Sequence, residues 1–395
     1  MIKKKSNILI FNMSANSDWQ NGIVNRNYFI LENLEKDDSI NKIISVDFLP
    51  ISLKPGLKYY YHNLLFNSKN KQIIYGDMTS ACYKATDKIY VYSSVDSVWS
   101  PKTISKELNK IIKKLNLDNL IVWSYNPMFL DFLNKLNYEQ FVFDTVDNWT
   151  EHKAYLKLIK KKKLMNNYKK IAAKADYIFT VSDELTEFYK QFGREDNVHW
   201  IPNGVDYHHY TNDENLQKQT VIDDEKRKII GYIGTIQDRI DFDLIKFIAQ
   251  KNEDKLIVLA GPIWKNVKKE IKNKLELLEN VKFLGRIKFE YAPSYINKFD
   301  VCIIPHKLTK FVQSMNPMKM YEYLALGKPV VTTEGAGVNN FKELLYIAKD
   351  KQEFNSFINH AINETDKNLK LKRQEAAKKH DWINKTNKML KIINK

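Results

Sequence analysis

Short apolar runs alternate with amphipathic stretches along most of the chain. Apolar or β-branched runs of four to eight residues predict strands, and apolar positions spaced three or four apart predict helices, as at residues 23–34 and 104–115. Alternating strands and helices indicate a mostly parallel sheet with both faces covered. In the first half we predict strands at residues 7–13, 42–48, 88–92, 120–123, 140–143, 177–181 and 198–201.

The second half repeats this pattern after a polar, weakly patterned stretch at residues 207–225. Its strands are predicted at residues 228–233, 256–259, 281–284, 301–304 and 329–332. The predicted fold class is α/β, with two Rossmann-like, doubly wound domains facing a central cleft. We assign residues 1–205 and 206–372 to these domains and residues 373–395 to a C-terminal helix, which begins near residue 371. Ligands are expected beyond the carboxyl ends of the strands.

The chain between the first strands is less regular. Residues 54–86 are rich in tyrosine and are interpreted as an insertion near a substrate cleft. Gly22, in the loop after the first strand, is predicted to let the backbone approach a phosphate or an acceptor, with a simple turn glycine as the alternative. The G-x-G-x-x-G fingerprint of NAD sites is absent. No zinc-ligand spacing, Walker loop, G-x-S-x-G or Cys–His signature occurs either.

Composition and charge limit the class of protein. No run of about 18 apolar residues occurs, so no transmembrane helix is predicted, and residues 8–13 are too short an apolar run for a signal peptide. The only cysteines, Cys82 and Cys302, fit a reducing compartment, so we predict a cytoplasmic protein. The formal net charge of +16 suggests nucleic acid or an anionic membrane as a partner, or else reflects codon bias.

A helix followed by a buried strand is predicted at residues 316–333. Asn316-Pro317 is a helix-start signal and Gly327 a stop signal. Free N–H groups at such a helix start suit a phosphate. Lys319 in the first turn and Glu322 three residues later are placed to hold a diphosphate and a ribose. The alternative is an ordinary helix–strand unit with solvated charges.

A second phosphate-binding candidate follows the first strand of the second half. Gly234 would permit a close approach of phosphate, and Arg239 could bind it. Asp241 and Asp243 have the D-x-D spacing of metal-dependent sugar transferases. Acidic residues at a helix start are the commoner explanation, and we predict no metal site.

Two further features lie in the first half. Residues 144–149 follow a strand and contain Asp144 and Asp147, which could supply an acid/base group or only a helix cap. Residues 152–176 are predicted to form one helix, rich in lysine, with apolar residues at helical spacing. Its basic side fits an anionic membrane, while a solvated helix packed on the sheet explains the apolar stripe. The predicted membrane contacts are Lys160, Lys161, Lys162 and Lys163.

Five motifs together resemble the GT-B glycosyltransferases of the large retaining group 1 type, over nearly the whole chain. They are Val-Ser-Asp-Glu-Leu at 181–185, Ile-Pro-Asn-Gly-Val-Asp at 201–206, Gly-Tyr-Ile-Gly at 231–234, Leu-Gly at 284–285, and residues 316–331. Residues 144–149 and 239–241 further resemble bacterial transferases of surface polysaccharide and teichuronic acid synthesis.

The resemblance implies an acceptor-binding first domain, a nucleotide-sugar-binding second domain and a final helix, around Trp382, that crosses back to the first. It implies that Glu322 binds the ribose, Gly285 lies against the base and Arg239 binds phosphate. Asp147 falls where many members have a histidine near the reacting sugar. The implied site residues are catalytic Asp147 and Arg239, and donor-binding Gly22, Gly234, Arg239, Gly285, Asn316, Lys319 and Glu322.

Two positions depart from the family pattern. Ser314 replaces the first of two glutamates spaced eight apart, and Thr235 replaces the basic residue next to Gly234. The implied function is transfer of a hexose from a nucleoside diphosphate sugar, expected to be a UDP sugar, to a glycan or lipid-linked acceptor. We expect no obligatory cofactor, a cytoplasmic enzyme peripheral to the inner membrane face, and no nucleic-acid partner. The alternative is a non-catalytic GT-B module that binds nucleotide sugar or glycan.

Overall fold

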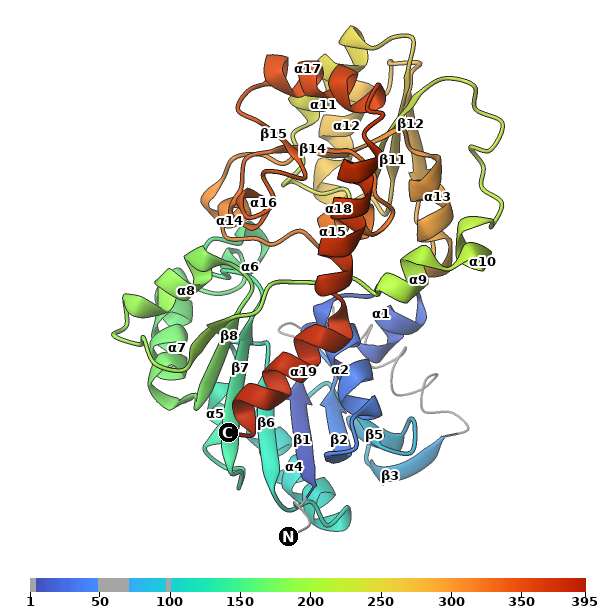
Figure 1. Ribbon diagram of the computed structural model, residues 1–395. Coiled ribbons are helices and arrows are strands. Elements are labelled where there is room, and N and C mark those ends of the chain that lie inside the picture. The colour runs from blue at the N-terminus through green and yellow to red at the C-terminus, as the bar shows by residue number, and fades with distance from the viewer. Residues whose placement is uncertain (1–4, 49–70, 97–100) are drawn as a thin grey trace. The chain divides into compact units, whose positions relative to one another are not determined.

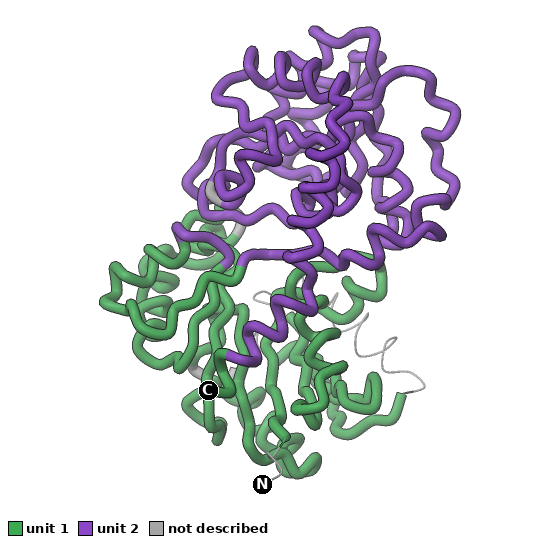
Figure 2. Tube along the Cα trace, viewed as in Figure 1, with its two compact units in different colours: residues 1–180, 185–201, 392–395 green, residues 181–184, 202–391 purple. Residues whose placement is uncertain are grey.

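The computed structural model describes residues 5–48, 71–96 and 101–395 (Figure 1). The chain forms two compact units, coloured separately in Figure 2. Unit 1 comprises residues 1–180, 185–201 and 392–395, and unit 2 comprises residues 181–184 and 202–391. Unit 2 thus includes residues 181–184 and 202–205, which the predicted boundaries assign to the first domain, and unit 1 includes residues 392–395 at the end of the predicted C-terminal helix.

The sheet of unit 1 has the strand order β3-β4-β5-β2-β1-β6-β7-β8-β9. The strands from β5 to β9 in this order pair in parallel, whereas β3 and β4 extend the sheet by antiparallel pairing. The strands are β1 (Ser6–Phe11), β2 (Ile40–Val46), β3 (Gln72–Gly76), β4 (Ser80–Lys84), β5 (Ile89–Ser94), β6 (Leu120–Ser124), β7 (Gln140–Thr145), β8 (Tyr177–Thr180) and β9 (Val198–Trp200).

The hairpin β3–β4 corrects the prediction of an irregular insertion at 54–86 for the part that the structure describes. Residues 49–70 lie outside the described residues. The turn after β3 is closed by Asp77, whose carboxylate accepts from the backbone N–H groups of Thr79 and Ser80 at 2.8 Å each. Such an Asx turn after Gly76 is a hairpin signal that sequence reading overlooked.

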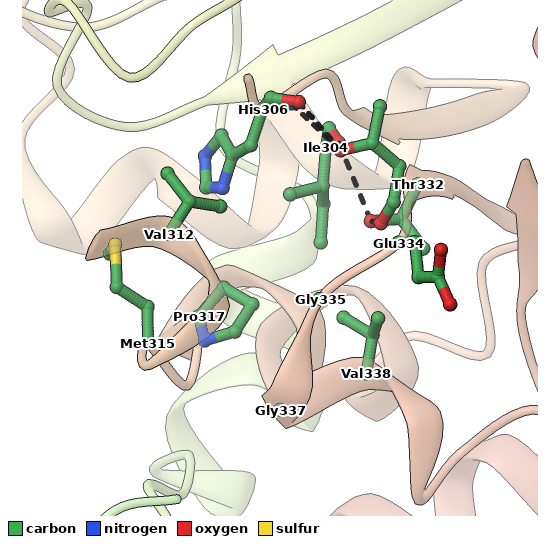
Figure 3. A pocket seen from close by; sticks show the side chains of 11 residues that line it. Ile304, His306, Val312, Met315, Pro317, Thr332, Glu334, Gly335, Gly337 and Val338 are labelled. Atoms are coloured by element: carbon green, nitrogen blue, oxygen red, sulfur yellow. Dashed lines mark hydrogen bonds between the residues drawn. The ribbon is translucent and has the colours of Figure 1, made fainter. Parts of the chain in front are cut away.

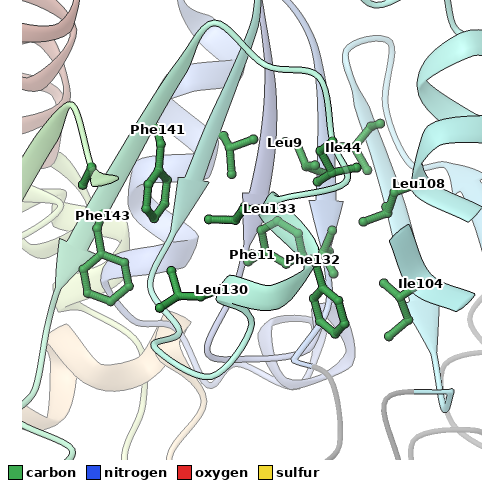
Figure 4. Close-up of a cluster of buried hydrophobic side chains, with 14 of the residues drawn as sticks. Leu9, Phe11, Ile44, Ile104, Leu108, Leu130, Phe132, Leu133, Phe141 and Phe143 are labelled. Atoms are coloured by element: carbon green, nitrogen blue, oxygen red, sulfur yellow. The ribbon is translucent and has the colours of Figure 1, made fainter. Parts of the chain in front are cut away.

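One face of this sheet carries a continuous apolar core (Figure 4). It joins residues of the central strands, such as Leu9 and Phe143, to Leu108 of α4 and Leu133 of α5. Alternating strand positions supply it, as expected for a sheet buried between helices. The helices before residue 202 are α1 (Asn16–Gln20), α2 (Arg26–Lys36), α4 (Pro101–Lys114), α5 (Leu130–Leu133), α6 (Lys153–Leu156), α7 (Lys161–Lys174) and α8 (Asp183–Lys190).

The sheet of unit 2 is parallel throughout, in the order β12-β11-β10-β13-β14-β15. Its strands are β10 (Ile229–Ile233), β11 (Leu256–Ala260), β12 (Val281–Gly285), β13 (Val301–Ile304), β14 (Val330–Thr333) and β15 (Tyr346–Ala348). Separate apolar clusters cover its two faces: Ile229 and Ile233 of β10 join one, and Ile230 and Tyr232 join the other. The observed architecture is therefore two parallel-sheet, Rossmann-like α/β domains.

The second unit holds most of the remaining helices. They are α9 (Tyr207–Thr211), α10 (Asp213–Leu216), α11 (Phe242–Lys251), α12 (Lys268–Leu275), α13 (Ala292–Lys298), α14 (Lys310–Gln313), α15 (Met318–Ala325), α16 (Ala336–Asn339), α17 (Lys351–Ile362), α18 (Lys367–Lys379) and α19 (Trp382–Ile393). The last two replace the single helix predicted from residue 371 onward.

The break between α18 and α19 has a clear cause. The carbonyl of His380 accepts from Val205 N at 3.1 Å, and Trp382 N donates to the Val205 carbonyl at 3.1 Å. A β-carbon on Gly204 would lie 2.2 Å from the His380 oxygen, so only glycine permits this approach. The contact takes the chain out of helical conformation at residue 381.

The predicted helix at residues 152–176 is also wrong as one element, because it is divided into α6 and α7. The backbone of Lys160 is extended and caps α7, and a turn at residues 157–160 buries Ile159 while leaving Leu158 exposed. The turn divides the lysine-rich segment into two short helices.

Candidate functional site

The loops after β10 and β13 leave the sheet of unit 2 at its topological switch point. These strands are neighbours, while β11 follows β10 on one side and β14 follows β13 on the other. In open α/β sheets, ligands bind beyond the strand ends at such a point. The loops also pair with each other: Lys307 N donates to Arg239 O at 2.8 Å, and Asp241 N donates to Pro305 O at 2.9 Å.

Three glycines end neighbouring strands at this edge. Gly234, Gly261 and Gly285 have φ angles of 138°, 150° and 68°, which side-chain-bearing residues rarely adopt. Gly261 N donates to Gly285 O at 2.6 Å, and Gly234 N donates to Ala260 O at 2.8 Å. Gly261 was not among the predicted site residues, although its place after an apolar strand and before Pro262 was a usable signal.

Lys319 lies in the first turn of α15, against the Gly234 loop. Its Cε is 3.0 Å from the position that a β-carbon on Gly234 would take, and its Nζ is 5.1 Å from the centre of the Tyr232 ring. Gly234 therefore leaves room for the lysine. The helix begins at Met318, with Pro317 as its N-cap residue.

Arg239 is oriented by two neighbours. With its carboxamide oxygen turned toward the guanidinium, Gln237 accepts from Arg239 Nη2 at 2.7 Å and from Nε at 2.8 Å. Nη1 lies 3.7 Å from the sulfur of Met315. Within the described residues, neither Arg239 nor Lys319 makes an ion pair with a carboxylate. Both cations are available to an anionic ligand.

Burial and mutual electrostatic interactions shift the pKa values of the charged groups in this cluster. Burial lowers the pKa of Lys319, and the charge of Arg239 lowers it further. Burial raises the pKa of Glu322, while Lys319 and the hydroxyl of Tyr210 act in the opposite direction. Burial, Lys319 and Arg239 hold the pKa of His306 well below its ordinary value. The buried Lys319 and the half-buried Arg239 thus lack full compensation, an arrangement suited to binding phosphate.

Asn316 and Ser314 have their side chains engaged by the protein. The Asn316 carboxamide oxygen accepts from Asn203 N at 2.8 Å and from the Tyr321 hydroxyl at 3.0 Å. The Ser314 hydroxyl donates to Phe311 O at 2.8 Å, and Ser314 O accepts from Ser182 Oγ at 2.7 Å. Asn316 fixes the loop before α15, and the Ser314 hydroxyl is directed to the backbone.

A family model described as "Glycosyl transferases group 1" matches residues 227–364, and one described as "Glycosyltransferase Family 4" matches residues 57–209. Together the two matches span most of both units. The chain is a GT-B glycosyltransferase.

Relatives and solved structures agree with this family. A Bacillus subtilis (strain 168) protein described as a teichuronic acid biosynthesis glycosyltransferase, TuaH, is 26% identical over 279 residues, covering 68% of this chain and 70% of that protein. HepE of Anabaena, solved with UDP and glucose, has a TM-score of 0.68 at 15% identity, covering 98% and 99% of the two chains. Sucrose-phosphate synthase of Thermosynechococcus elongatus has a TM-score of 0.70 at 12% identity, covering 99% and 98%. The two structures show the shared fold.

The D-x-D aspartates of this glycosyltransferase are used within the protein. Asp241 caps α11 and accepts from the backbone N–H groups of Asp243 and Leu244, and Asp243 pairs with Lys274 at 2.8 Å. The helix-start interpretation of these acids is confirmed. Across the described ranges, no cluster of three or more His, Cys, Asp and Glu residues is arranged to hold a metal ion.

Asp144 is a structural group of unit 1. Its carboxylate is 0% exposed and lies 2.9 Å from Nε of Arg26, which is 2% exposed. The prediction that a carboxylate at this strand end supplies acid/base chemistry is therefore wrong for Asp144. Asp147 is half-buried, and its carbonyl accepts from the Tyr168 hydroxyl at 3.3 Å. Asp147 remains a predicted catalytic residue.

The backbone conformation explains the glycine at two other predicted donor-binding positions, Gly22 and Gly285. Gly22 has a φ of 77° and ends α1, with its N–H donating to Trp19 O at 2.8 Å, so it has the turn role that was the alternative. A β-carbon on Gly285 would meet open space, so its φ, and not crowding, requires glycine there. Both stay predictions as ligand contacts.

The lysine-rich segment of the enzyme has one buried and one exposed side. Ile159, Tyr168 and Ile171 join the core of unit 1, as the packed-helix alternative predicted. Lys160, Lys161, Lys162 and Lys163 are exposed, with Lys161 paired to Glu151 at 2.6 Å. Within the part of the chain that is described, no helix combines the length and apolar character needed to cross a bilayer.

Proposed function

We propose that the enzyme transfers a hexose from a UDP sugar to a glycan or lipid-linked acceptor in cell-surface polysaccharide synthesis. The observation that carries this proposal is the pair of cations, Lys319 and Arg239, at the switch point of unit 2 without carboxylate partners among the described residues. HepE, which shares the fold, is described with UDP-glucose, and TuaH is named for teichuronic acid synthesis. These two names suggest the donor and the type of product.

In the proposed mechanism, Lys319 and Arg239 stabilise the negative charge that develops on the departing diphosphate. The N–H groups at the start of α15 add a partial positive charge there. Such pre-oriented donors lower the barrier because they need no reorganisation during the reaction. Glu322 would accept from the ribose hydroxyls; burial raises its pKa to about 7, against the opposing effects of Lys319 and Tyr210.

We propose that the reaction retains the configuration at the anomeric carbon. The leaving phosphate oxygen would accept the proton of the attacking hydroxyl on the same face of the sugar, while the new glycosidic bond forms and the bond to phosphate breaks. Asp147 would stabilise positive charge on the sugar ring in this transition state. The cations supply the electrostatic stabilisation, so the proposal needs no obligatory metal.

A panel of nucleoside diphosphate sugars tests the donor assignment. Bound donors stabilise the folded enzyme, so the correct donor should raise the melting temperature most. Calorimetry should then show weakened binding in Glu322→Ala and Arg239→Ala. Unchanged affinity in both variants would overturn the site, and the absence of binding to every sugar nucleotide would overturn the proposed function.

We also propose that the cytoplasmic enzyme contacts an anionic membrane through residues 157–163. Leu158 is 57% exposed among the exposed side chains of Lys157, Lys160, Lys162 and Lys163. An apolar side chain within a basic patch suits the headgroup region, where each lysine contributes about 1 kcal/mol.

Sedimentation with phosphatidylglycerol vesicles tests the membrane contact. The variant Lys160→Glu/Lys162→Glu/Lys163→Glu should stay in the supernatant. The matched control reverses the charge of three exposed lysines of α18, Lys372, Lys378 and Lys379. This variant should still sediment. If the wild type does not sediment, or if both triple variants behave alike, the membrane contact is wrong.

A further inference from the structure

A small pocket in unit 2 is bounded by the loop before α15 and the loop after β14 (Figure 3). Its walls are mostly apolar, formed by Ile304, Val312, Met315, Pro317 and Val338, together with the backbone of two glycines. The polar groups in the lining come from His306, Thr332, Thr333 and Glu334. The free space of about 10 Å³ accommodates one group the size of a water or a hydroxyl.

His306 is held rigidly in this wall. Its backbone N–H donates to Ile304 O at 3.0 Å, and its backbone carbonyl accepts from the Thr333 hydroxyl at 2.8 Å. It also forms an antiparallel bridge with Ile240 in the loop that carries Arg239. The backbone of His306 is therefore tied to the loop that carries Arg239.

The Nε2 atom of His306 is buried and has no hydrogen-bond partner within the described structure, in a residue that is only 4% exposed. An unsatisfied buried polar atom costs about 1–3 kcal/mol, so its presence in a pocket wall points to a ligand. Burial, together with Lys319 and Arg239, lowers the pKa of His306 and so favours the neutral ring. A neutral ring offers one N–H or one lone pair, which matches a hydroxyl group.

We infer that His306 binds one hydroxyl of the transferred sugar through Nε2, in the pocket between residues 312–317 and 332–338. The inference rests on the proposed donor site. The proposed site gives the diphosphate Lys319 and Arg239, whereas it assigns no side chain to the sugar. The nearby Ser314 hydroxyl donates to Phe311 O.

Calorimetry with UDP and UDP-glucose separates sugar binding from nucleotide binding. His306→Phe keeps a ring of similar size but removes Nε2. We expect at least a tenfold loss of affinity for UDP-glucose and less than a twofold change for UDP. If another UDP sugar gives the larger thermal shift in the donor panel, that sugar is used in place of UDP-glucose. The control is His360→Phe, at an exposed position on α17, which should change neither affinity.

Deoxygenated forms of the same donor identify the hydroxyl. One of them should bind the wild type at least tenfold more weakly, and His306→Phe should bind that form and the parent donor equally well. His306→Gln, which restores a polar group, should recover part of the discrimination and provides the measurement if the phenylalanine variant does not fold. Equal losses for UDP and UDP-glucose, or no loss for either, would overturn the inference. The proposed function would fail separately, through a wild type that binds no nucleotide sugar.

Discussion

The carbonyl oxygen of Gly234 occupies the space that a side chain on Gly261 would need, since a β-carbon there would lie 1.9 Å from that oxygen. The ends of β10 and β11 thus pack backbone against backbone. We expect Gly261→Ala to reduce the free energy of unfolding by at least about 2 kcal/mol, because both the clash and the φ of 150° oppose alanine. Urea denaturation measures the loss.

Gly285→Ala is the matched control in the same unit. Its φ of 68° is also unfavourable for alanine, but a β-carbon there meets open space. It should cost only the backbone strain, about 1 kcal/mol. If the two variants are equally stable, close packing of the strand ends is not what requires Gly261.

The pH dependence of UDP binding should report the protonation of Lys319. Burial and Arg239 lower the pKa of this lysine, so it loses its proton at a lower pH than an exposed lysine. The ionised diphosphate binds the protonated form, so affinity for UDP should fall as the pH rises through that pKa. Titration calorimetry from pH 7.5 upward avoids protonation of the phosphate itself, whose second pKa is about 6.

Two substitutions separate charge from packing at position 319. Lys319→Arg stays charged at every pH in this range, so its UDP affinity should be nearly independent of pH. Lys319→Ala should bind UDP about 10–100-fold more weakly, as expected for loss of a charged hydrogen bond. A wild-type affinity that is constant between pH 7.5 and 9.5 would contradict this prediction.

Local pattern was sufficient to predict the parallel sheets and the switch-point loops, because apolar runs and strand-end glycines have direct structural consequences. It was insufficient for side-chain partners distant in sequence. Asp144 follows a strand as a catalytic carboxylate would, but its buried partner Arg26 lies over a hundred residues earlier. His306 gave no motif, since its importance depends on the burial of Nε2 between loops that converge only in the fold.

Because Gln237 orients Arg239, we expect substitutions of these two residues to weaken donor binding to different degrees. Arg239→Ala should weaken UDP binding by about 10–100-fold because a charge-assisted contact is lost. Gln237→Ala leaves the charge but removes the acceptor that orients the guanidinium, so it should have a smaller effect of the same kind. Calorimetry that finds Gln237→Ala as damaging as Arg239→Ala would contradict the orienting role.

Metal removal should leave transfer activity largely intact. In the proposed mechanism Lys319 and Arg239 provide the positive charge at the diphosphate, so EDTA should change the initial rate by less than about twofold. The assay compares EDTA-treated enzyme with enzyme supplied with Mg²⁺ or Mn²⁺. A rate that depends on added metal would show that the two cations are not sufficient.

Substitutions of Asp144 and Asp147 should have different effects, the first on stability and the second on catalysis. Asp144→Asn removes the carboxylate charge that pairs with the buried Arg26, and breaking such a pair costs about 3–5 kcal/mol of stability. Asp147→Asn changes a residue that is only half-buried, so it should cost less stability than Asp144→Asn. Its transfer rate should nevertheless fall about 100-fold if the carboxylate stabilises the reacting sugar. Thermal unfolding and initial rates on the same preparations test both statements, and an active Asp147→Asn enzyme would remove Asp147 from the catalytic site.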